Sequence, residues 1–462
     1  MRRVTWIVPG ISAALLCSVS VSTQAQGPAG TFVYEGARLI IGDASAPIEN
    51  GAFVVVNGTI TAVGARGSVN APSGATRVDL TGKTVMPAIV NAHSHVGYER
   101  YTTYAGDSRP EYFTAENILD HLQREAFYGV GTVHDGGSAA LDVAQQYLVD
   151  SAARKYPPAA LYSLMAGIVP INGGPDHILI KATRPLRANF EVTRAPEARA
   201  AVQLVHAKGV RHIKMWYGDR NGTYPAMPRE LYDAAIDEAH KVGIKIHVHA
   251  SNNLRDQKDA VRSGADVLVH SLQGVRMDDE LIALVKEKKP YWTTVMGLGD
   301  RSELCEEEPF ATQTLTPKII ADVRGNDCKP NPNAATREAN LKYNFMRMIE
   351  SGARLILGSD TGVFPRYTFG WADHHEMQRY VELGLTPAQA IVASTSRPAE
   401  ALGLKEVGSL AAGKQADFIV LDASPLDDIR NTRKIAAVYL RGAKVDREAL
   451  LAKWRRASAT AQ

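Results

Sequence analysis

Long apolar runs are lacking in this chain beyond its first 26 residues, so no later segment is expected to span a bilayer. A basic face and an interleaving of aromatic with basic residues are also lacking, and the net charge is only +3, so nucleic acid is not an expected partner. Cysteine is scarce, with 3 residues in 462. There is no glycine-rich phosphate turn, which counts against an open, doubly wound sheet. The remaining composition, 45% hydrophobic and 22% charged, is that of a soluble enzyme with a large core.

The N-terminus has the order of parts found in a secretory signal. Arg2 and Arg3 precede an apolar run over 6–21, and small residues follow it. Residues 1–26 are therefore predicted to be a cleaved signal peptide, and the mature protein is expected to be secreted or periplasmic. A buried first helix is the alternative. A lipoprotein anchor at Cys17 is disfavoured because a bulky residue precedes it.

Removal of this leader would leave two cysteines, Cys305 and Cys328, in one polar, acidic segment. In an oxidising compartment they are expected to form a disulfide that closes a loop of about 23 residues and stabilises by roughly 3 kcal/mol. Two unpaired thiols are the alternative.

The residue patterns at both ends of the mature chain predict β-strands. In 27–84, two apolar runs flank Asn57-Gly58, which predicts a hairpin with a two-residue turn. In 406–462, residues 416–421 read as a strand and 438–440 as part of a second hairpin. Neither end has enough strands for a stable core. We therefore expect one small β-sandwich domain built from both termini.

Between them, residues 85–405 alternate strand and helix signals. A helix is predicted over 228–241, Thr386 begins a capping box, and Ser396 is expected to cap a helix that stops at Gly403. Eight strands alternating with helices are typical of a closed parallel (β/α)8 barrel, with an open doubly wound sheet as the alternative. The expected strands are 85–93, 130–135, 160–168, 211–216, 243–249, 265–270, 290–296 and 354–360.

Metal-ligand side chains recur where these strands end. The first strand ends in His93-Ser94-His95, and residues i and i+2 of a strand project to the same side. Since barrel active sites form at the C-terminal ends of the strands, five strands would deliver nitrogen or oxygen atoms to one rim. A buried histidine with a structural role is the alternative for each strand taken alone. The candidates from later strands are Lys214, His247, His249, His270 and Asp360.

These motifs resemble the amidohydrolase superfamily of metal-dependent hydrolases, in the branch near imidazolonepropionase and the Xaa-Pro and Xaa-Arg dipeptidases. His-x-His, Ile213-Lys214, His247, His270 and Gly358-Ser359-Asp360-Thr361-Gly362 match in order and spacing. The resemblance covers nearly the whole mature chain and includes the tail motifs Leu385-Thr386-Pro387, Gly408-Ser409-Leu410 and 413–417. It says much less about substrate, because 134–135, 173–177 and 216–220 depart from the family pattern in loops that shape specificity.

The resemblance implies a two-metal site. An ammonium cannot ligate a cation, but a neutral amine of Lys214 could take up carbon dioxide and become a bridging carbamate, as in related enzymes. A lysine that caps the barrel or binds a substrate carboxylate is the alternative. His249 is given a supporting or substrate-binding role. His93, His95 and Asp360 would hold one metal and His247 and His270 the other, with zinc expected and manganese or cobalt able to replace it.

The implied reaction is hydrolysis of an amide bond in a dipeptide or an N-acyl amino acid. Two cations would activate a bridging water, and Asp360 would accept its proton and return it to the leaving nitrogen. The alternatives are a cyclic-amide hydrolase or deaminase, a lactonase or phosphotriesterase on the same metals, and a non-catalytic barrel with a structural metal. A homo-oligomer is compatible with the sequence. Candidate substrate contacts, each otherwise a solvated loop residue, are Tyr98, Arg100, His177, Tyr217 and Arg366.

Overall fold

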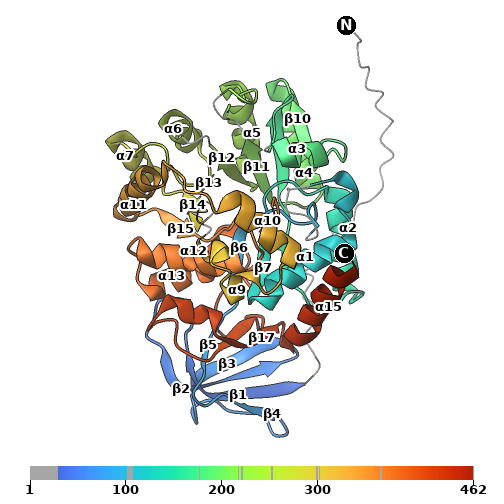
Figure 1. The fold of residues 1–462 in the computed structure, drawn as a ribbon, viewed down its shortest axis with the longest axis vertical. Helices are drawn as coiled ribbons and strands as arrows, with labels where there is room; N and C mark the ends of the chain where they lie inside the picture. The colour runs from blue at the N-terminus through green and yellow to red at the C-terminus, as the bar shows by residue number, and fades with distance from the viewer. Residues whose placement is uncertain are drawn as a thin grey trace.

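The structure is a computed structural model. It describes residues 30–100, 108–175, 177–216, 218–219, 222–250, 253–297, 300, 302–364 and 367–460, with the side chains of 177, 178, 459 and 460 left out. The expected signal peptide lies outside these residues. Figure 1 shows a barrel wrapped in helices above a smaller sheet. No helix in the described part of the chain is long and apolar enough to cross a membrane.

The smaller sheet is built from both ends of the chain, as expected. Its strands are β1 (Thr31–Leu39), β2 (Ile48–Val56), β3 (Thr59–Ala65), β4 (Thr76–Asp79), β5 (Thr84–Pro87), β16 (Phe418–Leu421), β17 (Ile435–Leu440) and β18 (Ala443–Lys444). The described strands form one mixed sheet, β18-β17-β16-β5-β1-β2-β3, with β4 beside β1.

Aromatic rings from both termini fill the core of this sheet. The rings of Tyr34 and Phe53, from the N-terminal strands, stack with centroids 4.8 Å apart. Phe418, from β16, meets Phe53 edge to face at 5.0 Å. The predicted hairpin turn at Asn57-Gly58 is confirmed, with φ of 49° and 81°, the positive values that a two-residue turn requires. The two ends therefore fold as one unit.

Parallel strands form the barrel, and backbone hydrogen bonds between β6 and the residues that follow β15 close it. The third barrel strand is divided, because β8 pairs with β7 while β9 pairs with β11. Ala92 N donates to Leu357 O at 2.8 Å and Asp360 N to His93 O at 2.9 Å, which joins the last strand to the first. The strands are β6 (Ile89–Ser94), β7 (Val130–Asp135), β8 (Leu161–Ser163), β9 (Ala166–Pro170), β11 (His212–Trp216), β12 (Lys245–His249), β13 (Val267–Val269), β14 (Tyr291–Thr293) and β15 (Arg354–Ile356).

Two details differ from the expected strands. The run expected as one strand over 85–93 splits at Pro87, so that β5 belongs to the small sheet and β6 to the barrel. An additional strand, β10 (Asn189–Val192), pairs with β9 alone among the described strands. The split makes one apolar run part of both sheets, which fixes the barrel on its neighbour.

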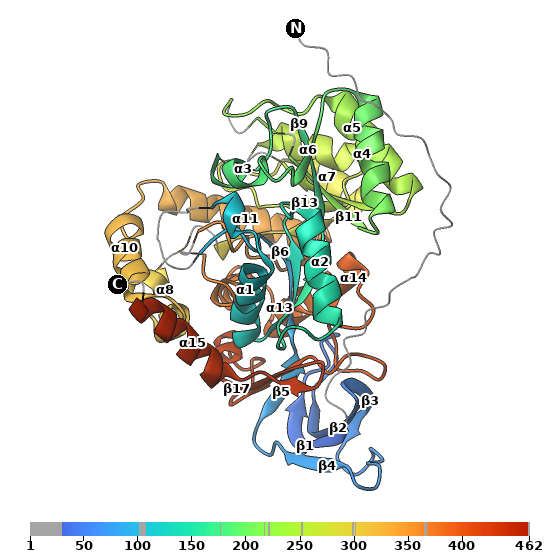
Figure 2. The same cartoon turned by 90° about the vertical axis from the view of Figure 1, so that its right-hand side faces the viewer.

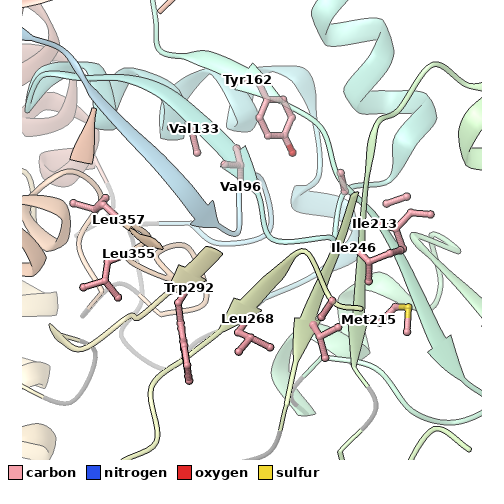
Figure 3. Packing of buried hydrophobic residues seen from close by; sticks show 14 of the residues in the cluster. Val96, Val133, Tyr162, Ile213, Met215, Ile246, Leu268, Trp292, Leu355 and Leu357 are labelled. Atoms are coloured by element: carbon pink, nitrogen blue, oxygen red, sulfur yellow. The ribbon is translucent and has the colours of Figure 1, made fainter. Parts of the chain in front are cut away.

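Strand alternation separates the hydrophobic shell from the interior of the barrel. Ile213 and Met215 of β11 and Ile246 of β12 belong to one large buried cluster that also contains helix residues. Figure 3 shows these three side chains near one another. The residues between them, including Lys214 and His247, therefore point to the interior.

Helices cover the barrel and complete the chain. They are η1 (Pro110–Tyr112), α1 (Ala115–Phe127), α2 (Leu141–Ala152), α3 (His177–Thr183), α4 (Ala195–Ala207), α5 (Arg229–Lys241), α6 (Leu254–Ser263), α7 (Asp279–Lys288), α8 (Ser302–Cys305), α9 (Pro309–Thr312), α10 (Pro317–Asp327), α11 (Ala334–Glu350), α12 (Trp371–Glu382), α13 (Pro387–Ser394), α14 (Ser396–Leu402), η3 (Ile429–Arg433) and α15 (Arg447–Thr460). The Thr386 capping box is confirmed. The cap of α14 is Thr395, one residue before the expected Ser396.

A disulfide between Cys305 and Cys328 joins α8 to the end of α10, as expected, and spans 23 residues. The segment it encloses packs through Ala311 and Ile319 against the flank of the barrel, where Trp454 of α15 also lies. Figure 2 shows α15 returning from the small sheet to this flank.

Candidate functional site

A cavity of about 280 Å³ opens at the C-terminal ends of the barrel strands. Residues from β6, β11 and β12 and from the loops after β13, β14 and β15 line it. The lining residues are His93, His95, Pro175, Leu179, Lys214, Trp216, His249, Ala250, Gln257, His270, Ser271, Gln273, Val295, Arg337, Asp360 and Val363. Of the six side chains expected to hold metal, the cavity brings together all but His247.

The carboxylate of Asp360 contacts the imidazoles of both His93 and His95. Its Oδ1 lies 3.2 Å from His93 Nε2 and 3.1 Å from His95 Nε2. Burial alone would raise the pKa of Asp360, but the hydrogen bonds from His93 and His95 outweigh it, so this pKa lies well below its usual range. Burial, and then the nearby Lys214 ammonium, hold the pKa of His93 well below its usual value, so that imidazole is neutral.

Buried polar groups hold the His95 imidazole and the backbone of His93. His95 Nδ1 lies 2.8 Å from Ser138 Oγ, and the Ser138 turn is held by Asp135, whose Oδ1 accepts from Gly137 N and Ser138 N at 2.8 Å each. A partner of this kind fixes the ring orientation of a metal-binding histidine. Asn91 Oδ1 accepts from the backbone N of His93 at 2.9 Å, which fixes the strand at that residue.

The amine of Lys214 reaches the same point from β11. The side chain is fully buried, and its Nζ lies 3.3 Å from His93 Nε2. Gly137 makes room for it, since a Cβ at Gly137 would collide with Lys214 Cβ and the residue has a φ of 86°. Lys214 pairs with His247 in the strand register and so starts at the same depth in the barrel. Its long side chain nevertheless reaches the level of the rim.

The second pair of imidazoles differs from the expected one. The rings of His249 and His270 lie edge to face with centroids 4.5 Å apart, and both side chains line the cavity. His247 lies two residues earlier on the same face of β12, about 7 Å deeper in the barrel. Its Nε2 is 3.1 Å from His212 Nδ1. The structure thus brings His249, and not His247, to the wall of the cavity.

His247 belongs to a separate buried group with His134 and His212, whose ligand atoms lie within 4.8 Å of one another. His212 Nε2 donates to Leu402 O at 3.1 Å, so its Nδ1 accepts the hydrogen bond from His247 Nε2. Burial holds the pKa of all three imidazoles below the usual value. The described residues thus contain two histidine-rich groups able to hold a metal, and only the group around Asp360 opens to the cavity.

Three cavity residues have strained backbones. His270, Val295 and Asp360 each follow a barrel strand and have φ of 72°, 49° and 55°, in the left-handed region that non-glycine residues seldom adopt. His270 N donates to Thr293 O at 2.8 Å, which with the Asp360 contact described above fixes the turns at His270 and Asp360. Strain of this kind is typical of functional sites.

The two expected substrate contacts whose side chains the structure describes, Tyr98 and Arg100, do not line the cavity. Tyr98 is fully buried and its hydroxyl donates to Ser138 O at 2.7 Å, so it packs in the core behind His95. The Arg100 guanidinium lies 4.4 Å from the Tyr112 ring centroid and lines a different pocket. The side chain of His177, and all of Tyr217 and Arg366, lie outside the described residues.

Sequence reasoning missed several lining residues, notably Gln257, Ser271, Gln273 and Arg337. Ser271 and Gln273 lie in the loop after β13, just beyond His270. Their position after a barrel strand could have marked them as cavity residues. Arg337 comes from the start of α11, far from any strand end, and no local pattern marks it.

The residues around Asp360 fit divalent cations. Two nitrogen or oxygen ligands of one tetrahedral zinc lie about 3.3 Å apart, close to the separations of Asp360 Oδ1 from His93 and His95. His93 Nδ1 is buried without a hydrogen-bond partner, so Nε2 is its only engaged nitrogen. The donor set, of imidazoles and a carboxylate, is one that zinc, manganese or cobalt accepts.

The chain belongs to the amidohydrolase family, whose model matches residues 84–445. It is a metal-dependent hydrolase of that family, and hydrolysis of carbon–nitrogen bonds is its class of reaction.

Three similar proteins place it within the family. A 5-methylthioadenosine/S-adenosylhomocysteine deaminase of Halalkalibacterium halodurans is 23% identical over 424 residues, covering 85% of each chain. An imidazolonepropionase of Deinococcus radiodurans is 26% identical over 433 residues, covering 86% of this chain and 92% of that one. The crystal structure of a Xaa-Pro dipeptidase has a TM-score of 0.69 at 21% identity and covers 90% of this chain and 99% of its own.

Proposed function

We propose that the chain hydrolyses the amide bond of a small peptide-like substrate, an N-acyl amino acid or a dipeptide. The observation that carries the proposal is the convergence of Asp360, Lys214 and the cavity imidazoles on one point of the cavity floor. His93, His95 and Asp360 would hold one divalent cation, and His249 and His270 the other, with zinc favoured.

Lys214 would connect the two cations. Its neutral amine adds carbon dioxide to form a carbamate and releases one proton, which replaces a buried cation with an anionic ligand. The full burial of Lys214 beside His93 supports this proposal, because an unmodified ammonium there would repel both metals.

The cations, when bound, would lower the pKa of a water molecule and polarise the substrate carbonyl. Asp360 accepts the proton of the attacking water through its carboxylate and returns it to the leaving nitrogen, so the amine departs neutral. His93 and His95, the latter oriented through Ser138, hold that carboxylate in place.

A screen of dipeptides and N-acyl amino acids with metal-loaded protein tests the proposal, with a nucleoside, a lactone and an organophosphate as competing substrates. Amide cleavage that disappears with chelator and returns with zinc is expected. Turnover of the nucleoside, the lactone or the organophosphate without any amide cleavage would contradict it. An Asp360→Asn variant should keep its fold and lose turnover.

We also propose that the mature enzyme works outside the cytoplasm. The Cys305–Cys328 disulfide supports this location, since such bonds persist in oxidising compartments. N-terminal sequencing of protein from the periplasm or medium of an expressing bacterium should find residues 1–26 removed.

A further inference from the structure

One cationic side chain at the rim of the cavity has no acidic partner among the residues that the structure describes. Arg337 lies in the first turn of α11, is exposed, and lines the cavity together with His249, His270 and Asp360. Its guanidinium donates to the side-chain oxygen of Gln273, a neutral acceptor. Within the described residues, no carboxylate forms an ion pair with it.

Neighbouring arginines are neutralised. Arg347, on the same helix, pairs with Glu350 at 2.8 Å and Asp279 at 3.2 Å. Glu338, the residue after Arg337, accepts instead from Arg379 on α12 at 2.6 Å. Among the described residues, Glu338 and the acids beside Arg347 are thus paired with other groups, and Arg337 lines the cavity mouth without a carboxylate partner.

Hydrogen bonds hold α11, which carries Arg337, against the loop that follows His270. Asn344 Nδ2, from α11, donates to Leu272 O at 2.7 Å and Val275 O at 2.9 Å, in the loop that follows His270. This clamp ties the middle of α11 to the loop that carries Gln273, and Asn340 Nδ2 adds a hydrogen bond to Gln273 O at 3.3 Å. Little conformational freedom would be lost when a ligand binds there.

We infer that Arg337 binds a carboxylate of the substrate and makes the enzyme selective for acyl amino acids and dipeptides with a free carboxyl end. The inference rests on the proposed function, since it names the group beyond the scissile amide. A guanidinium matches a carboxylate with two parallel hydrogen bonds. The cavity's only described carboxylate, Asp360, is held by His93 and His95 and does not compete.

The test compares an N-acyl amino acid with its primary carboxamide, because the two share the scissile bond and differ only in the anionic group. Acid release from the acyl end is measured for both. In Arg337→Gln, kcat/KM for the carboxylate should fall about tenfold to hundredfold, mainly through KM, while the carboxamide changes less than twofold. Arg337→Lys should recover part of the loss, since it keeps the charge and loses the fork.

Arg347→Gln is the matched control and should leave the preference ratio unchanged, because Arg347 is paired and lines no part of the cavity. An unchanged ratio in Arg337→Gln would overturn the inference. If the native enzyme cleaves neither compound, the proposed function fails. The inference is then decided by calorimetry, which measures the affinity of 3-phenylpropionate and of 3-phenylpropionamide for the native chain and for Arg337→Gln. A loss of affinity for the carboxylate alone supports it. An equal loss for both compounds, or no loss for either, overturns it.

Discussion

The imidazoles of His249 and His270 face each other across the cavity floor with ring centroids 4.5 Å apart, while His247 hydrogen-bonds His212 one layer below. The register explains the arrangement, because His249 pairs with Trp216 and His247 with Lys214. Only the outer of two histidines on one strand face can reach the level of the rim.

His249→Ala and His247→Asn should therefore have different effects. Loss of His249 should reduce bound metal from about two ions to about one per chain, with little change in stability, because the side chain faces a cavity. His247→Asn should keep both ions and lower stability by about 1–3 kcal/mol, because it breaks a buried hydrogen bond. Metal analysis and urea unfolding distinguish them; full metal content in His249→Ala would reject the assignment.

The hydroxyl of Ser138 should matter for metal affinity. It contacts His95 Nδ1 at 2.8 Å, and loss of such a partner costs roughly tenfold to hundredfold in affinity. Competition with a chelator should show this weakening in Ser138→Ala. Ser163→Ala is the control, because Ser163 Oγ contacts only His134 among the three deeper imidazoles. Equal affinities in both variants would mean that Ser138 has no part in metal binding.

A pair of buried carboxyls should make stability depend on pH. Burial, and then the neighbouring Asp373, raise the pKa of Glu125 well above its usual range, and burial raises the pKa of Asp373 to about 7. Both native pKa values exceed the unfolded ones, so the native state binds more protons. Their contribution is present below the unfolded pKa and is lost as pH rises through 7.

Glu125→Gln should flatten that dependence between about pH 5 and pH 8 in urea unfolding, since it removes one of the coupled groups. Glu350→Gln, at an exposed ion pair, should leave the slope as in the native chain. A native chain whose stability does not fall over this range would contradict the shifted pKa values.

The disulfide should stabilise the segment between α8 and α10. Removing it by Cys305→Ser with Cys328→Ser should cost about 3 kcal/mol for a loop of this length. Reductant should lower the Tm of the native chain to that of the double variant and leave the variant unchanged. Identical unfolding of oxidised and reduced protein would show that the bond adds nothing.

Much of the fold could be predicted because its signals are local. Strand and helix alternation, the turn at Asn57-Gly58 and the cap at Thr386 each depend on a few adjacent residues. The division of the third strand, the extra strand β10 and the single terminal sheet depend on pairing between distant segments, which no short pattern encodes.

The site was predictable in composition more than in detail. Strand ends marked His93, His95, His270 and Asp360, because parallel strands bring their ends to one rim. Depth within the barrel could not be read from periodicity, which marks His247 and His249 alike and does not tell which of them lines the cavity. Tyr98 also follows a strand end but is buried in the core, and its position in the sequence does not indicate that orientation.

Anomalous diffraction from crystals of the metal-loaded protein tests the central claim most directly. The account predicts two peaks about 3.5–4 Å apart, one against His93, His95 and Asp360 and the other against His249 and His270, with density for a carbamate on Lys214. Peaks only among His134, His212 and His247, with the cavity residues unliganded, would contradict it.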